Sequence, residues 1–399
     1  MLKHLHISEL KTGMHVASPD IDWKTRPYLY FADEYIATEE QVQQIIAQGF
    51  QEVYIDLDKS SSSSPTTPTL SAEQELSEHK KTATPKAKTA LEEELPKAVK
   101  VHGESIGYAR RFMNDMRAGK VNMEDASQNM EHIMGSLERN ADALLSLSRL
   151  QQTDNYTYTH CVNVCILTTM FARHLRQNDK KIFAAGLAGM FHDLGKAMVP
   201  LAILNAPRKL NDAEFAVMRS HPVLGYEQLV TVPNILPEVL MGAIQHHEKY
   251  NGTGYPHGLA GDAISNIGCM VGVADIYDAL TSTRPYKTSI HPHRALGIMF
   301  EMRDKDLQHE YIAQFIRMLG IYPVGSVVEM EDGSMGVVSA SNEEWPLKPV
   351  VTIVRNPDGK KIVGKKYNLA EEIHAPAIVN CMSAGMTDID PAKALGISL

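Results

Sequence analysis

The feature that most constrains the fold is a stretch from about residue 105 to residue 320 in which apolar residues recur almost wholly at helical spacing. Within residues 123–150, for instance, Met130, Ile133, Met134 and Leu137 lie on one helical face. The same spacing predicts further helices over residues 158–175, 182–192, 236–247, 264–281 and 293–318. A stretch this long with a single period is typical of an all-helical domain.

One more helix is indicated by its end signals. Asn211 is a suitable N-cap, and Glu214, three residues later, is its capping-box partner. The His221-Pro222 pair then interrupts this helix, because a residue before proline is pushed out of the helical region.

The segments that flank the helical stretch have different patterns. Residues 1–58 contain short alternating apolar segments and one short helix over 39–49, which predicts a small α+β module. Residues 59–100 are rich in Ser, Thr, Pro, Lys and Glu. Such a stretch buries too little apolar surface to become ordered, so we predict a flexible linker, at most transiently helical over 90–98. Beyond Tyr322, short β-rich runs separated by turn signals predict a β-rich extension over 326–399.

The expected fold class is therefore mainly α. An all-helical domain over 141–325 follows a helical connector over 101–140, with the small α+β module at the N-terminus and a short β appendage at the C-terminus.

Composition excludes several classes of protein. The chain has 48 acidic and 39 basic side chains, a net charge of -9, whereas a protein that binds a nucleic-acid polymer needs a basic surface. Its 4 cysteines include no CxxC pair, which fits a reducing compartment, and Cys161 and Cys165 are expected to be packing residues. The N-terminus lacks the apolar region of a signal peptide, and no segment has the ~18 apolar residues that span a bilayer. These observations predict a cytoplasmic protein without membrane insertion.

Polar side chains that can bind metal ions recur in and at the ends of the apolar helices. Taken singly, each is more often a core or surface residue than a ligand. Adjacent residues diverge by ~100° on a helix, so the two adjacent pairs can reach one ion only at frayed helix ends. As a group they are more informative, because buried imidazoles need something to satisfy them. The five histidines and two aspartates of this group are His160, His192, Asp193, His221, His246, His247 and Asp275.

The size of this group indicates the kind of site. Seven donors exceed the four ligands of a structural zinc ion, which are commonly thiolates. They suit two ions of the iron or manganese type with one carboxylate bridging them. Pairs of metal ions ~3.5–4 Å apart activate water and stabilise charge in phosphoryl transfer. The residues therefore predict metal-assisted hydrolysis of a phosphoester.

Basic and aromatic residues follow the same motifs. Lys196, Arg284 and Lys287 could each be ordinary surface charges, but beside a metal cluster they are better interpreted as phosphate-binding groups. The loop 251–258 carries three glycines around Tyr255, which can stack on a ligand or donate a hydrogen bond to it. The alternative for this loop is a plain surface turn. Three cations at one place would hold an anion despite the net negative charge.

Four motifs occur in a fixed order, HDLGK (192–196), HP (221–222), HHEKYNGTGYP (246–256) and ADIYDALTSTRPYK (274–287). In this order they resemble the HD-GYP subgroup of the HD phosphohydrolase superfamily, over about residues 140–325. The resemblance implies an all-helical catalytic domain with a bi- or trinuclear iron or manganese centre. It also implies hydrolysis of cyclic di-GMP to pGpG, and on to GMP, by a metal-activated hydroxide. Residues 1–58 resemble, more weakly, a small uncharacterised domain that precedes some HD-GYP domains.

The resemblance also implies residue roles. The seven histidines and aspartates above correspond to the metal ligands, with Asp193 as the bridge. Asp193 and Lys196 are the expected catalytic residues. Lys196, Arg284 and Lys287 occupy phosphate-binding positions and Tyr255 belongs to the signature loop. Asp278 falls at an acidic position of the family motif, where it is expected to bind substrate or to hold a metal ligand or a water molecule.

Two positions depart from the family pattern. Trinuclear members carry a glutamate one turn before the first ligand histidine, where this chain has Tyr156. A phenol is a poor substitute for a bridging carboxylate, so we predict two divalent ions, iron or manganese. Asn251 replaces a common aspartate, which removes a charge near the substrate.

Three alternatives remain at this stage. The domain could bind a cyclic dinucleotide without hydrolysing it and act as a sensor. It could prefer cyclic GMP-AMP, or hydrolyse another nucleotide, since nothing in the sequence fixes the bases. Residues 1–58 could form a homodimer, contact a signalling partner, or serve only as a packing accessory.

Overall fold

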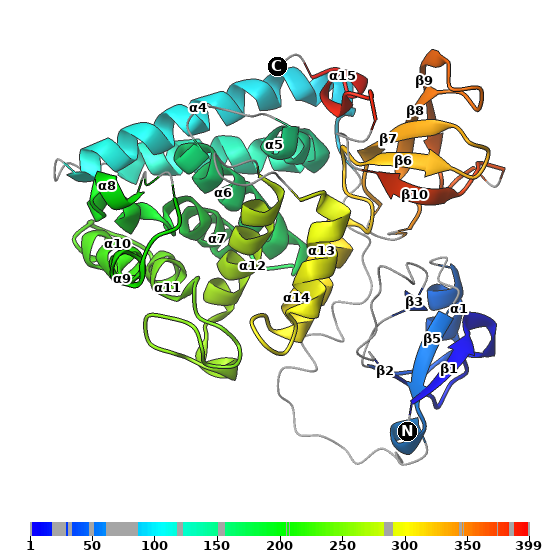
Figure 1. The fold of residues 1–399 in the computed structure, drawn as a ribbon, viewed down its shortest axis with the longest axis horizontal. Coiled ribbons are helices and arrows are strands. Elements are labelled where there is room, and N and C mark those ends of the chain that lie inside the picture. The colour runs from blue at the N-terminus through cyan, green and yellow to red at the C-terminus, as the bar shows by residue number, and fades with distance from the viewer. Residues whose placement is uncertain are drawn as a thin grey trace.

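The computed structural model describes residues 2–17, 29–30, 34–47, 52–60, 87–117, 123–150, 156–204, 206, 208–282, 290–342, 345, 347–372, 374–382 and 387–397. The chain forms an N-terminal sheet, a body of helices and a C-terminal sheet (Figure 1). None of the helices in these ranges is long and apolar enough to cross a membrane.

The N-terminal module is α+β, as predicted. Its sheet has the order β1-β5-β2-β4, with β3 paired in parallel to β5. Along β5, Val53 and Ile55 are buried and alternate with half-buried neighbours, the pattern of a strand with one face on a core. The elements are β1 (Leu2–His6), η1 (Ile7–Glu9), β2 (His15–Ala17), β3 (Leu29–Tyr30), β4 (Glu34–Tyr35), α1 (Glu39–Ala47), β5 (Glu52–Asp56) and α2 (Leu57–Ser60).

The helical body carries most of the chain. Its elements are α4 (Leu91–Arg117), α5 (Met123–Leu150), α6 (Tyr156–His174), α7 (Asp179–Phe191), η4 (Leu194–Met198), α8 (Leu201–Leu204), α9 (Asp212–Met218), α10 (His221–Val230), α11 (Pro237–Gln245), η5 (Gly261–Ala263), α12 (Asn266–Thr281), α13 (Pro292–Glu301) and α14 (His309–Leu319). Asn211 caps α9 in the predicted capping box with Glu214, and α10 begins at His221 with Pro222 in its first turn.

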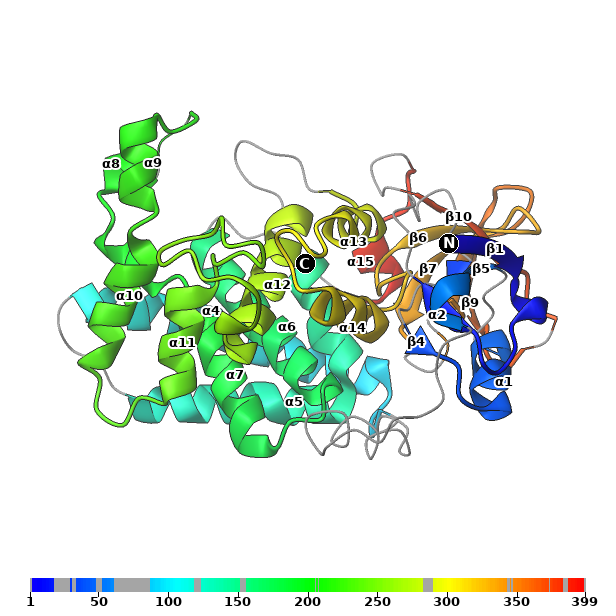
Figure 2. The same ribbon diagram turned by 90° about the horizontal axis from the view of Figure 1, so that it is seen from below.

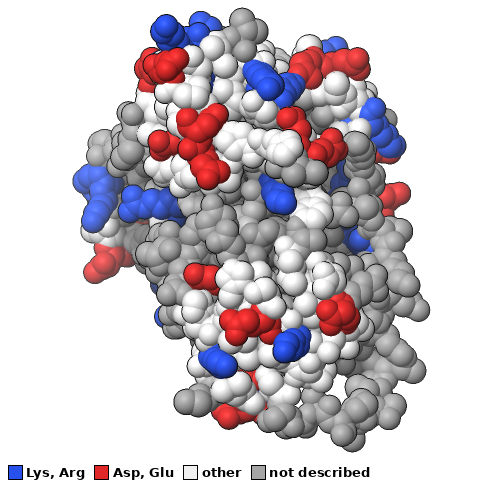
Figure 3. Space-filling view, turned by 90° about the vertical axis from the view of Figure 1, so that its right-hand side faces the viewer, with Lys and Arg blue, Asp and Glu red and all other residues white. Residues whose placement is uncertain are grey.

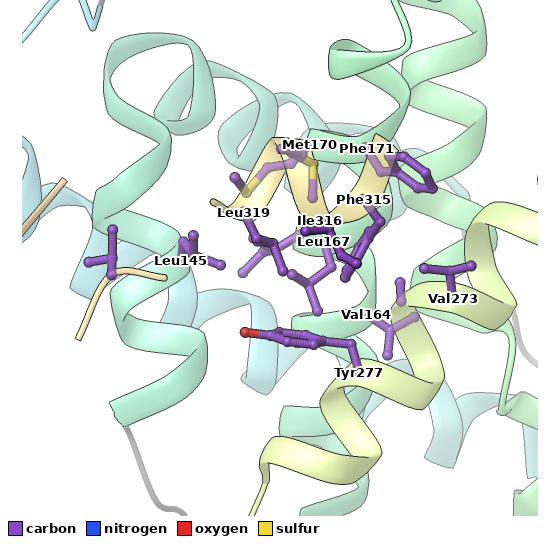
Figure 4. Packing of buried hydrophobic residues seen from close by; sticks show 14 of the residues in the cluster. Leu145, Val164, Leu167, Met170, Phe171, Val273, Tyr277, Phe315, Ile316 and Leu319 are labelled. Carbon is purple, nitrogen blue, oxygen red and sulfur yellow. The ribbon is translucent and has the colours of Figure 1, made fainter. Parts of the chain in front are cut away.

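Helix α6 lies at the centre of this body and packs against α4, α5, α7, α12 and α14. It is apolar on nearly every side, so it must be covered on all sides. Figure 4 shows Val164, Leu167 and Phe171 of α6 beside Tyr277 of α12 and Phe315 of α14. The Phe171 and Phe315 rings meet edge to face with their centroids 5.2 Å apart. The residues of α6 that carry polar groups are therefore held in a rigid environment.

The predicted linker ends earlier than residue 100. Helix α4 begins at Leu91, and Leu95 and Ala98 are buried. The Glu94 carboxylate accepts hydrogen bonds from Ser136 at 2.7 Å and from Arg139 at 2.6 and 2.9 Å. These contacts with α5 stabilise the first turns of α4, whose sequence is charged but amphipathic. Residues 61–86 lie outside the described part of the chain.

Two other boundaries differ from expectation. Residues 293–318 form two helices instead of one, because a turn containing Asp304 at φ 59° separates α13 from α14. The boundary expected at residue 140, between the helical connector and the helical domain, is only a kink, because Asn140 has non-helical φ and ψ inside α5. Both sides of that kink belong to one core, as the stacking of Phe112 on Phe191 at 4.2 Å across α4 and α7 illustrates.

The C-terminal extension is an antiparallel sheet of order β10-β6-β7-β8-β9 followed by α15 (Pro391–Ala394). Its strands are β6 (Val327–Met330), β7 (Met335–Ala340), β8 (Val350–Arg355), β9 (Lys361–Asn368) and β10 (Ile378–Met382). Ser341 donates a hydrogen bond to Asp142 of α5 at 3.0 Å, which connects the sheet to the helices. Charges of both signs are interspersed on the face of the molecule shown in Figure 3.

Gly195 fixes the approach of η4 to α10. A Cβ at this position would lie 1.8 Å from the His221 carbonyl oxygen and 2.5 Å from the Gly225 nitrogen. Both neighbours are backbone atoms, which cannot move aside without shifting α10.

Gly195→Ala is therefore expected to destabilise the protein by about 1–3 kcal/mol or more, the usual range for overpacking. The matched control is Gly103→Ala in α4, where no atom lies within 4 Å of the new Cβ. That change should stabilise the protein by about 0.5–1 kcal/mol, because alanine suits a helix interior better than glycine. Urea unfolding of both variants measures the difference, and equal stability of Gly195→Ala and the parent would contradict the assignment.

Candidate metal centre

The structure brings together all seven side chains that the sequence singled out as metal ligands. Their ligand atoms form two groups, and within each group the atoms lie within 4.8 Å of one another. One group is Asp193, His221, His246 and His247, and the other is His160, His192 and Asp275. Six of the seven side chains are buried, and His247 is half-buried.

Helix ends explain how adjacent residues reach the same place. His192 directly follows α7 and His246 directly follows α11, each as the C-cap residue. Asp193, beyond the cap, has φ -96° and ψ 9°, so its side chain leaves the helical spacing. Three of the other ligands lie on helices, with His160 in α6, His221 at the start of α10 and Asp275 in α12, while His247 lies in the turn after α11.

Asp193 lies between the two groups. Its Oδ2 is 3.5 Å from Nε2 of His160 and 3.4 Å from Nε2 of His192. Its Oδ1 is 3.2 Å from Nε2 of His221 and 3.7 Å from Nε2 of His246. Each carboxylate oxygen therefore faces one set of imidazole nitrogens, which is the arrangement a bridging carboxylate needs.

Asp275 completes the second group and reaches toward the first. Its Oδ1 lies 3.1 Å from Nε2 of His160 and 3.9 Å from Nε2 of His192. Its Oδ2 lies 3.9 Å from Nδ1 of His247.

Three of the histidines are held in the same way. Nδ1 of His192 donates to the Gly189 carbonyl at 2.8 Å, Nδ1 of His221 to that of Met218 at 2.7 Å, and Nδ1 of His246 to that of Ala243 at 2.9 Å. A carbonyl can only accept, so the proton of each neutral ring sits on Nδ1. Nε2 of each ring consequently carries a lone pair directed at the cluster.

These nitrogens and oxygens fit metal ions and fit little else. Nε2 of His192 and Oδ1 of Asp193 are buried without a hydrogen-bond partner among the described residues. Nε2 of His221 and Nε2 of His246 lie only 3.2 Å apart, although both rings already use their protons on Nδ1. Lone pairs this close repel each other unless a cation lies between them.

The protonation states agree with metal binding. Burial lowers the pKa of His246 to about 4, so its ring is neutral at pH 7. Burial and the neighbouring His246 lower the pKa of His247 well below its ordinary value. Burial opposes ionisation of Asp193, but Lys196 and His192 hold the pKa of this carboxyl well below its usual range. His246 and His247 are thus neutral and Asp193 is ionised, the ligand forms that bind divalent ions.

Asp278 orients a ligand histidine, and the substrate-binding role expected for it stays a prediction. Its Oδ2 accepts from Nδ1 of His160 at 2.7 Å. Its Oδ1 accepts from Asn163 at 2.9 Å and from Ser282 at 3.1 Å. Asn163 in turn accepts from Nε2 of His102 in α4 at 3.3 Å. These partners fix the tautomer of His160 and leave its Nε2 for the cluster.

Of the three predicted cations, only Lys196 lies in the described part of the chain, while Arg284 and Lys287 lie outside it. Nζ of Lys196 contacts Oδ2 of Asp193 at 2.5 Å, and its side chain is 24% exposed. Lys196 therefore neutralises a ligand in this structure and also reaches the open side of the site.

The loop that carries Tyr255 folds back over the cluster. The Tyr255 ring lies 4.7 Å from the His247 ring, centroid to centroid. The Tyr255 amide donates to the His247 carbonyl at 3.1 Å. At Gly254 a Cβ would lie 2.3 Å from the Lys249 nitrogen and 2.5 Å from the Glu248 Cα, so only glycine allows this approach.

Glu248 holds this loop in place. Its side chain is fully buried, and its oxygens accept from the amides of His257 at 2.7 Å and of Leu259 at 2.9 Å. No role was predicted from the sequence for Glu248, for Asn163, or for Arg219, whose guanidinium lies over the Tyr255 ring. Asn163 could have been found as a polar residue three positions after the ligand His160, and Glu248 as the acidic residue directly after the ligand His247.

The comparisons with known proteins agree with this geometry. Residues 122–311 match the family model of an HD domain. Residues 2–126 match a domain of unknown function (DUF3391), and residues 327–383 match a KOW domain associated with the HD domain.

Several characterised proteins are similar to the chain. A cyclic di-GMP phosphodiesterase of Pseudomonas aeruginosa is 34% identical over 399 residues, which covers 99% of this chain and 93% of that protein. A cyclic di-GMP phosphodiesterase response regulator of Xanthomonas campestris is 35% identical over 42% of this chain and 45% of its own length. A 3'3'-cGAMP-specific phosphodiesterase of Vibrio cholerae is 35% identical over 42% of this chain and 36% of its own length.

The fold and the cluster define a phosphohydrolase of the HD type, a metal-dependent class. With the HHEKYNGTGYP motif and a relative similar over nearly the full length, the chain belongs to the HD-GYP family of this superfamily.

Asn163→Ala is expected to weaken metal binding by about 10–100-fold, the usual effect of losing a hydrogen bond that orients a ligand. The variant frees Oδ1 of Asp278 and thereby loosens His160. Titration of the metal-free protein with Mn²⁺ in a calorimeter measures the effect. The matched control is Thr168→Val, a buried change on the same helix that removes only a bond to the Val164 carbonyl. Equal affinities for both variants would contradict the role given to Asn163.

Glu248→Gln should loosen the loop 251–260, because an amide offers only one oxygen to the two backbone donors that the carboxylate now accepts. Hydrogen–deuterium exchange, followed by mass spectrometry of this loop, should show faster exchange at His257 and Leu259. The helices that carry the metal ligands should exchange as in the parent, and an unchanged loop would refute the role of Glu248.

Proposed function

We propose that the protein is a metal-dependent phosphodiesterase that hydrolyses cyclic di-GMP to pGpG, GMP or both. The observation that carries the proposal is the position of Asp193, whose two oxygens face two adjacent groups of donors. The full-length similarity to a cyclic di-GMP phosphodiesterase supports the choice of substrate.

We infer that the site holds two divalent ions, iron or manganese. Each group offers imidazole nitrogens and carboxylate oxygens, without a thiolate, which suits these ions. Such a pair, when bound, lowers the pKa of water and stabilises charge on a phosphodiester.

The chain's own residues prepare the site for an anion. Asp193 and Asp275 supply the two carboxylates, and Asp278 keeps the His160 ring oriented. Lys196 places its ammonium group at the Oδ2 side of Asp193, where it can neutralise an oxygen of an incoming phosphate. Tyr255 covers His247 and offers an aromatic face next to the cluster.

A second candidate is hydrolysis of cyclic GMP-AMP, because two similar proteins of Vibrio cholerae are 3'3'-cGAMP-specific phosphodiesterases. A sensor that binds without hydrolysis is disfavoured, since all seven expected donors converge. Cytoplasmic location, and dimerisation or a signalling partner through residues 1–58, stay predictions.

Protein loaded with Mn²⁺ or Fe²⁺ is expected to convert cyclic di-GMP to pGpG, and Asp193→Ala should abolish turnover because both donor groups lose their shared carboxylate. Chromatography of the products measures the reaction, and elemental analysis should give two ions per chain. Tight binding of cyclic di-GMP without turnover by the fully loaded protein would favour the sensor. Faster turnover of cyclic GMP-AMP in competition would favour the second candidate.

A further inference from the structure

Arg219 is a cation beside the metal centre, and the proposed function assigns it no role. It directly follows α9 and lies two residues before the ligand His221. Figure 2 shows α8 and α9 projecting from the helical body above α10. The Arg219 guanidinium carbon lies 4.6 Å from the centroid of the Tyr255 ring. Because Tyr255 also lies against His247, one aromatic ring connects Arg219 to the ligand cluster.

The charge of Arg219 is available to a ligand. Its side chain is exposed. Lys196, by contrast, is engaged by Asp193. An arginine that lies over an aromatic ring keeps the N–H groups in its own plane free to donate. Stabilisation of the loop by this contact alone is about 0.5–1 kcal/mol at an exposed site.

The position of Arg219 suits contact with a base of the substrate more than contact with the reacting phosphate. The reacting phosphodiester must lie at the metal ligands, whereas Arg219 contacts the Tyr255 ring at 4.6 Å and that ring contacts His247 at 4.7 Å. The bases of a cyclic dinucleotide extend outward from its phosphates. The arginine fork matches the O6 and N7 acceptors of guanine. Adenine presents an amino donor in place of O6 and mismatches that fork.

We propose that Arg219 is a substrate-binding residue that recognises a guanine base of the cyclic dinucleotide through its O6 and N7 atoms, beside Tyr255. This proposal rests on the proposed function, because it presumes a guanine nucleotide at the cluster. It makes Arg219 a determinant of base specificity, while the metal ligands and Lys196 act on the phosphate.

The test compares Arg219→Ala and Arg219→Lys with the parent on three substrates. For cyclic di-GMP both variants should raise KM by about 5–150-fold, which corresponds to the ~1–3 kcal/mol of one bidentate contact to guanine. The lysine variant should not restore binding, because it keeps the charge and loses the fork. Both variants should bind cyclic di-AMP with the same affinity as the parent. Turnover of bis(p-nitrophenyl) phosphate, which has no base, should be unchanged.

Four outcomes would overturn the proposal. An unchanged KM for cyclic di-GMP would show that Arg219 does not contact the substrate. Restoration by lysine, or an equal effect on cyclic di-AMP, would show that it contacts phosphate. Slower turnover of bis(p-nitrophenyl) phosphate would show that it acts on the metal centre. The matched control is Lys209→Ala, which removes an exposed positive charge from the segment between α8 and α9.

Equilibrium binding separates this proposal from the proposed function. If the metal-loaded parent binds cyclic di-GMP but does not hydrolyse it, the proposed function fails, and the ratio of dissociation constants between parent and Arg219→Ala still tests Arg219. If the parent neither binds nor hydrolyses cyclic di-GMP, both are overturned.

Discussion

The structure depends on one buried carboxylate. Asp193 lies between two sets of imidazoles, and each of its oxygens faces one set. A buried carboxylate surrounded by lone pairs is unstable without compensating positive charge. Lys196 supplies one charge, and metal ions would supply the rest. The helices that meet here must therefore place their ends accurately, and much of the packing serves this requirement.

That accuracy comes from backbone contacts more than from the ligands themselves. Carbonyl groups three residues earlier orient the rings of His192, His221 and His246. Gly195 lets η4 lie directly against the first turn of α10, which sets the distance from Asp193 to His221. The apolar helix α6 is enclosed on all sides, and His160 is buried within it. Residues that never touch a metal ion thus decide whether the site can form.

The sequence predicted the helical body and the ligand set because both leave local signals. Apolar spacing marked α5, α6, α7, α11 and α12, and the motif order singled out all seven donors. It missed the break between α13 and α14, because the turn over residues 302–308 contains no glycine or proline that would mark it. The sequence-based prediction also ended the linker too late. By its residue type Glu94 is expected to be a solvated surface charge, and only the folded chain brings Arg139 of another helix to pair with it.

The sequence by itself determined which residue types would meet, since the donors and their order along the chain are fixed in it. Only the tertiary structure decided how they divide into two groups, which oxygen of Asp193 faces which group, and that Asp278 binds His160. It alone placed Arg219 over Tyr255, 36 positions later in the chain. The physical reason is that these relations join helices distant in sequence, and their distances are set by packing that no local pattern encodes.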